Sequence, residues 1–106
     1  MLVKTLKDIK AREIVPGFLG RFIHSENMTV AYWEITAGSL LPEHTHHHEQ
    51  IVNVIEGILE LTVENRIYKL EPGSVVVIPP NIPHSGKSIT ECNVIDIFYP
   101  VREDYK

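Results

Sequence analysis

The sequence predicts an all-β fold, a small sandwich or barrel that forms a single domain over residues 1–106. From Phe18 onward, no stretch keeps apolar residues at the i, i+3, i+4, i+7 positions of an amphipathic helix for three turns. Short extended segments recur instead at intervals of about eight to twelve residues, with turn residues between them. At 106 residues, of which 43% are hydrophobic, the chain can build one core but not two.

The elements are expected in the following order. Residues 1–17 form an N-terminal arm or a short helix, and strands follow at residues 18–24, 29–36, 50–56, 58–63, 67–70, 75–78 and 93–99. The clearest strand is 58–63, because Leu59, Leu61 and Val63 alternate with polar residues, as in a strand with one buried face. Residues 64–66 then turn the chain into 67–70, which predicts a hairpin.

Composition excludes several classes of partner. Ten Lys and Arg against fourteen Asp and Glu give a formal charge of −4, with no basic run, so nucleic acid is not expected as a partner. The longest apolar runs are far shorter than the roughly twenty residues that span a bilayer, and residues 1–13 do not resemble a secretory signal. Cys92 is the only cysteine, so a reducing cytoplasm is the expected location.

Four of the six histidines lie within residues 44–48. Residues two apart on a strand point to the same face, about 6.6 Å apart at Cα, which is close enough for imidazoles to converge on one ion. His44, His46, His48 and Gln50 share this parity, whereas His47 points to the outer face. A solvated polar loop or an engineered tag is the alternative reading of this run.

Two spaced motifs add context to the cluster. In residues 38–57, Gly38 precedes His44 and His46, and Gln50 follows; in residues 73–88, Gly73 precedes His84. This pattern resembles the two motifs of the cupin superfamily. The resemblance implies a small double-stranded β-helix, or jelly-roll, barrel with one divalent metal ion inside. The implied ligands are His44, His46, Gln50 and His84; on its own, His84 would more simply close a turn.

The motifs depart from the family pattern at two positions. Asn81 stands where the second motif usually has glycine, and asparagine tolerates left-handed backbone conformations. Gln50 replaces the usual carboxylate ligand, so the ion keeps its full charge, which favours Lewis-acid chemistry over oxygen activation. If the strand bulges, Glu49 replaces Gln50 as ligand. Mn, Fe, Co, Ni and Zn all accept such ligands.

The carboxyl-terminal residues 96–105 carry a second resemblance. Asp96 interrupts an apolar strand, where an unpaired carboxylate is costly, so it has a partner, reaches solvent or serves chemistry. Together with the His44–Gln50 arrangement, this ending resembles the KdgF group of pectin degradation proteins. That resemblance implies proton transfer by Asp96, a substrate-stacking wall at Phe98 and a carboxylate clamp at Arg102. The alternative for Arg102 is a surface ion pair with Glu103 or Asp104.

The resemblance implies an enzyme that opens 4,5-unsaturated uronates, released from pectin or alginate, to the 4-deoxy-5-keto form. Its partner is then a small molecule, a sugar acid, with His48 as a further substrate contact. The alternatives are another cupin enzyme, such as a dioxygenase or a keto-acid isomerase, and a non-catalytic metal-dependent binding module. Apolar residues on both faces of 50–56 and 93–99 predict a homodimer that buries one sheet. Tyr32 and Trp33 are expected in core or interface packing, and His24 at the surface.

Overall fold

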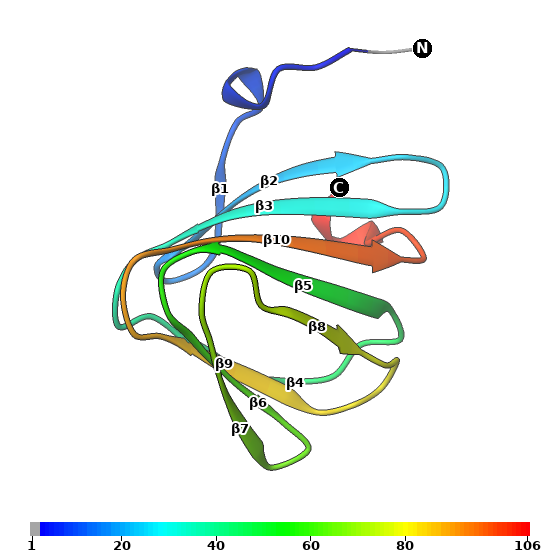
Figure 1. Ribbon diagram of the computed structural model, residues 1–106. Coiled ribbons are helices and arrows are strands. Elements are labelled where there is room, and N and C mark those ends of the chain that lie inside the picture. Colours follow the sequence, from blue (N-terminus) through cyan, green and yellow to red (C-terminus); the bar gives the residue numbers. More distant parts are fainter. Residues whose placement is uncertain (1–2) are drawn as a thin grey trace.

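The computed structural model describes residues 3–106 and contains ten strands and two short 3-10 helices in that range (Figure 1). In chain order the elements are η1 (Leu6–Asp8), β1 (Arg12–Val15), β2 (Phe18–His24), β3 (Thr29–Ile35), β4 (Leu40–His44), β5 (Glu49–Glu56), β6 (Leu59–Val63), β7 (Arg66–Leu70), β8 (Val75–Ile78), β9 (His84–Ser88), β10 (Cys92–Tyr99) and η2 (Glu103–Tyr105). Neither helix of the described residues is long and apolar enough to cross a membrane.

The strands form two antiparallel sheets. The first has six strands in the order β1-β2-β3-β10-β5-β8, and the second has four in the order β4-β9-β6-β7. The sheets face each other and enclose the hydrophobic core (Figure 1). The predicted all-β, double-sheet architecture is therefore confirmed.

Strict alternation decides what faces the interior. In β10, Cys92, Val94, Asp96 and Phe98 are buried and the residues between them are more exposed. In the pairing with β5, Asp96 lies opposite Val52 and Phe98 lies opposite Gln50. Because paired residues share a face, Asp96 and Gln50 both point into the barrel.

All seven predicted strands exist, with ends displaced by at most one residue. Strands β1, β4 and β9 were not predicted. β9 reads His-Ser-Gly-Lys-Ser and β4 contains Pro42, so neither shows apolar alternation, yet each pairs with the other and thereby completes the second sheet. The predicted N-terminal arm contains the short helix η1 but also β1, which was missed, and its residues 1 and 2 lie outside the described residues.

Candidate metal centre

Three histidines converge at one end of the barrel. His44 ends β4, His84 begins β9, and the two are paired across the sheet. His46 lies in the connection from β4 to β5. One ring nitrogen from each of the three lies within 4.8 Å of the others, and the ring centroids of His44 and His84 are 4.2 Å apart. The three histidines that the cupin resemblance implies as ligands therefore lie close together, and their binding of a metal stays a prediction.

Backbone carbonyls fix which nitrogen of each ring faces the centre. The Nδ1 atoms of His44 and His84 lie 2.8 Å from the carbonyl oxygens of Pro42 and Ile82. A carbonyl only accepts, so Nδ1 carries the proton and Nε2 keeps its lone pair. The Nε2 atom of His84 is buried and has no hydrogen-bond partner among the described residues. This tautomer is the one a metal-binding histidine needs.

Gln50 lies beside His46. The His46 Nδ1 atom faces the His48 carbonyl at 3.2 Å, and its Nε2 atom faces Gln50 Oε1 at 3.0 Å. Both facing oxygens accept, and a neutral imidazole carries only one proton, so one contact joins two lone pairs. A cation held by His46 and Gln50 together would satisfy both groups.

Two of the three histidines have lowered pKa values, as metal ligands require. Burial, followed by the charge of Arg102, lowers the pKa of His46 to about 4. Burial likewise lowers the pKa of His84. The lowered pKa values leave the lone pairs of His46 and His84 available at pH 7. With His44 and Gln50, these residues fit a divalent ion that accepts nitrogen and oxygen ligands.

The second motif is held against the first by the backbone. Asn81 has a φ of 65°, the left-handed conformation in which asparagine replaces glycine at low cost. Its N–H donates to the His46 carbonyl oxygen at 2.8 Å. The turn before His84 is thus fixed to the turn that carries His46.

Asp96 lies in the same cavity as His44, Gln50 and His84. It is 8% exposed, Trp33 donates its indole N–H to Oδ2 at 3.0 Å, and Oδ1 has no hydrogen-bond partner among the described residues. Burial raises the pKa of Asp96 to about 7, and the neighbouring Gln50, Trp33 and Arg102 act against that rise. Of the three alternatives for Asp96, a partner is present, but Trp33 as that partner carried no signal in the sequence. A chemical role stays a prediction.

Arg102 also lines the cavity and is 7% exposed. It donates from Nε and Nη2 to the two carboxylate oxygens of Asp104, at 3.0 and 2.8 Å. Its guanidinium lies 4.7 Å from the ring centroid of Phe98 and 4.0 Å from that of Tyr105. The alternative reading predicted an ion pair with Asp104 at the protein surface. The ion pair is present, but the Arg102 guanidinium is buried and does not lie at the surface.

His48 does not reach the cavity wall. It is buried, its Nε2 faces the Val101 carbonyl at 3.3 Å, and its Nδ1 has no partner among residues 3–106. Its role as a substrate contact stays a prediction. His47 and Glu49 are exposed, as their parity predicts, so Glu49 does not replace Gln50 at the cluster.

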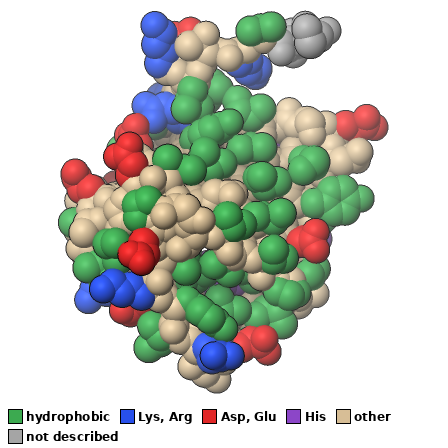
Figure 2. Space-filling view, viewed as in Figure 1, with side chains coloured by type: hydrophobic (Ala, Val, Ile, Leu, Met, Phe, Trp, Pro, Cys, Tyr) green, Lys and Arg blue, Asp and Glu red, His purple; other side chains and the backbone are tan. Residues whose placement is uncertain are grey.

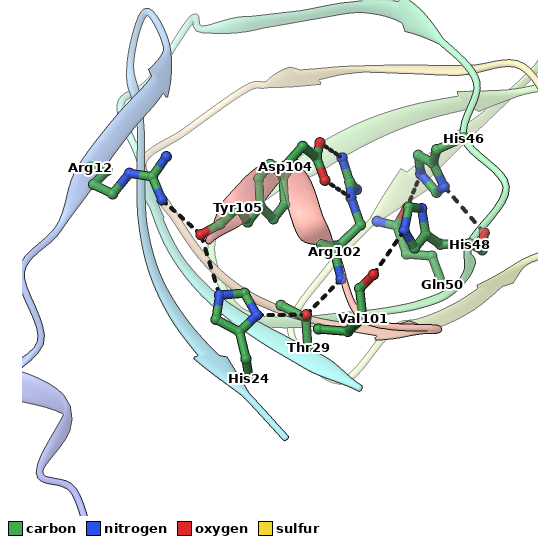
Figure 3. A network of polar contacts seen from close by, with 10 residues as sticks. All are labelled: Arg12, His24, Thr29, His46, His48, Gln50, Val101, Arg102, Asp104 and Tyr105. Atoms are coloured by element: carbon green, nitrogen blue, oxygen red, sulfur yellow. Dashed lines mark hydrogen bonds and ion pairs between the residues drawn. The ribbon is translucent and has the colours of Figure 1, made fainter. Parts of the chain in front are cut away.

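Figure 3 shows the polar contacts that link the cluster to the tail. Sequence reasoning missed two participants. Tyr105 packs against Phe22 and Trp33 as well as against Arg102. His24 was expected at the surface but is partly buried and faces Thr29 and the Tyr105 carbonyl.

The chain is similar to known proteins in sequence and in fold. A cupin domain family model matches residues 31–98. A KdgF structure from Halomonas sp. is 25% identical, with a TM-score of 0.88 over 94% of each chain. An RmlC-like cupin structure from Shewanella frigidimarina NCIMB 400 is 24% identical, with a TM-score of 0.92 over 97% of this chain and 94% of that one. These likenesses agree with the jelly-roll fold expected from the motifs.

Part of this sequence also matches part of a longer protein. An uncharacterized HTH-type transcriptional regulator of Bacillus subtilis, YobQ, is 37% identical over 60 residues, which cover 55% of this chain and 25% of the regulator. The match therefore spans about a quarter of that relative's length.

Proposed function

Because the chain belongs to the cupin domain family, we propose that it is a metal-dependent enzyme that opens 4,5-unsaturated uronates to the 4-deoxy-5-keto form. The observation that carries the proposal is the cavity, which is lined by His44 and His84 of the three-histidine cluster together with Asp96 and Arg102. Overall similarity to the Halomonas KdgF structure supports the same substrate class.

The reaction is an isomerisation with three bond changes in the substrate. The C1–O bond of the ring breaks, the C1 hydroxyl loses its proton, and the enol released at C5 becomes a ketone when C4 gains a proton. A divalent ion on His44, His46, Gln50 and His84 would supply Lewis-acid polarisation of substrate oxygens. Asp96 moves the proton, because its Oδ1 is free while Trp33 holds Oδ2 in place.

Arg102 and Phe98 bind the substrate in this proposal. A guanidinium matches a carboxylate in two parallel hydrogen bonds, and the uronate carries its carboxylate next to the double bond. Phe98 is 2% exposed and lies under the guanidinium, so it forms a rigid wall of the cavity. The substrate is thereby placed with its reacting end toward the histidines.

Replacement of Arg102 tests this orientation. Arg102→Gln is expected to raise KM for an unsaturated uronate by about 10- to 100-fold, because a charged hydrogen bond to the carboxylate is lost. Ring opening removes the double bond conjugated to the carboxylate, so the decay of ultraviolet absorbance measures the rate. The matched control is Arg66→Gln, an exposed residue at the start of β7, which should leave KM unchanged. An unaltered KM in Arg102→Gln would remove the clamp from the proposal.

A non-catalytic binding module remains the second candidate. The regulator that shares 60 residues with this chain favours it, since its name describes a DNA-binding protein and not an enzyme. In that case the metal only holds a ligand, and the wild-type protein binds a small acid without turning it over. A dioxygenase activity is less favoured, because Gln50 replaces the carboxylate that oxygen activation commonly uses. A keto-acid isomerase activity stays an alternative.

We also propose that the protein is a homodimer through the outer face of the six-stranded sheet. Exposed apolar side chains lie on β2, β5, β8 and β10 of that sheet: Leu19, Ile55, Val75, Val77 and Tyr99. Hydrophobic side chains are numerous on the face seen in Figure 2. Exposed apolar side chains gathered on one face of a sheet are typical of interfaces.

Val77, which is 59% exposed on the edge strand β8, provides the test. Val77→Lys is expected to convert a dimer into a single 12.1 kDa chain, because a charge cannot be buried unpaired in the interface. Light scattering after size-exclusion chromatography measures the mass. Lys69→Ala, on the exposed β7, is the control and should stay dimeric. A wild-type mass equal to one chain would contradict the dimer.

A further inference from the structure

A chain of hydrogen bonds ties the tail to β2 and β3 (Figure 3). The backbone N–H of Arg102 donates to Thr29 Oγ1 at 2.8 Å, and Thr29 is completely buried. Thr29 Oγ1 lies 2.9 Å from His24 Nδ1, and His24 Nε2 lies 3.3 Å from the Tyr105 carbonyl oxygen. Arg12 donates to that same carbonyl at 2.7 Å.

The direction of every proton in this chain follows from the partners. The Tyr105 carbonyl only accepts, so His24 donates from Nε2 and its Nδ1 is left as an acceptor in a neutral ring. The Thr29 hydroxyl donates to Nδ1, and its oxygen accepts the Arg102 N–H. Each group is satisfied in a single arrangement, which leaves the tail one favoured position.

The hydrogen-bonded series begins at the backbone of Arg102 and ends at the backbone of Tyr105, and both residues determine where the Arg102 guanidinium lies. Arg102 lies at one end, and Tyr105, whose ring lies 4.0 Å from the guanidinium, lies at the other. Asp104, between them, accepts two hydrogen bonds from the same guanidinium, and these bonds lower its pKa. The position of the backbone from 102 to 105 therefore sets the direction of the Arg102 side chain.

We propose that Thr29 and His24 are positioning residues that aim Arg102 at the carboxylate of an acidic substrate. The inference rests on the proposed function for the identity of that substrate. Neither residue lines the cavity, so neither touches the substrate, and their effect passes through the tail. Loss of these hydrogen bonds is expected to weaken binding of the substrate carboxylate, while proton transfer by Asp96 is unchanged.

A matched pair at Thr29 tests the inference. Thr29→Val removes the hydroxyl at nearly constant volume, and Thr29→Ser keeps it. Thr29→Val is expected to raise KM for an unsaturated uronate about tenfold with kcat within about twofold of wild type, and Thr29→Ser is expected to stay near wild type. Thr62→Val on β6, outside the hydrogen-bond chain, is the control. A KM in Thr29→Val equal to wild type, or a loss confined to kcat, would overturn the inference.

Nuclear magnetic resonance of the Arg102 side chain separates this inference from the proposed function. The Nε–H signal, assigned by its absence in Arg102→Gln, should be visible in wild type and Thr29→Ser and broadened beyond detection in Thr29→Val. If wild type does not act on the uronate, the proposed function fails, and this signal alone decides the positioning claim. A sharp signal in Thr29→Val would contradict it.

A second variant covers the case in which Thr29→Val does not fold. His24→Phe keeps a ring stacked near Phe22, 6.5 Å away in the structure, but removes both hydrogen bonds. It is expected to show the same rise in KM and the same loss of the Arg102 signal. A folded His24→Phe with wild-type KM and a sharp signal would refute the role of the chain.

Discussion

Asp96→Asn is expected to lower kcat on an unsaturated uronate by about 10²- to 10⁴-fold, the range that a general acid–base residue contributes. The replacement keeps the shape of the side chain and an oxygen that accepts the Trp33 indole N–H, 3.0 Å away in the wild type. An amide cannot exchange the proton, so the chemical step fails while the cavity is preserved. The measurement is the initial rate of absorbance decay at saturating substrate.

Metal content and an exposed replacement provide the controls for this variant. Asp96 is not one of the proposed ligands, so the metal stoichiometry should equal that of wild type. Asp8→Asn, an exposed replacement on η1, should retain full activity. Wild-type turnover in Asp96→Asn would show that the proton moves elsewhere. A wild-type protein that binds the uronate without turnover would favour the binding module.

Removal of the metal is expected to abolish turnover and to lower the melting temperature. An ion at about 100 times its dissociation constant adds about 2.7 kcal/mol to the free energy of unfolding. For a domain of this size that corresponds to a shift of about 10–20 °C. Chelator-treated protein and metal-loaded protein are compared by thermal melting.

A single ligand replacement makes the same test without chelator. His84→Ala removes a buried ring whose Nε2 has no other partner among the described residues, so the melting temperature of the variant should no longer respond to added metal. His47→Ala is the matched control, because His47 is exposed and is not one of the proposed ligands. A wild-type melting temperature that is indifferent to metal and chelator would contradict the site.

The sequence predicted those parts of the fold that are encoded locally. Alternation located β6 and β10. Parity along residues 44–50 was less informative, because residues 45–48 are not part of a strand and His48, which shares the parity of His46, does not line the cavity. Alternation also placed Asp96 and Phe98 on one face of β10, where both are buried. The resemblance of the two motifs to the cupin superfamily implied that His84 would join the cluster from a distant part of the sequence.

The remaining features depend on pairing between distant segments. β4 and β9 carry polar and small residues, so their strand character arises only when they pair with each other. Trp33 meets Asp96 because β3 lies beside β10, a register that no local pattern specifies. The bond from Thr29 to the Arg102 backbone joins residues 73 positions apart. The cytoplasmic location rests on the single cysteine and stays a prediction.

The most direct test of the central claim is the decay of ultraviolet absorbance of an unsaturated galacturonate monomer with metal-loaded wild-type protein. Chelator-stripped protein and Asp96→Asn run in parallel, and the spontaneous rate is subtracted. The account predicts decay well above the spontaneous rate for the loaded wild type and none in the other two samples. A flat trace with protein shown to be fully metal-loaded would contradict the uronate-opening function.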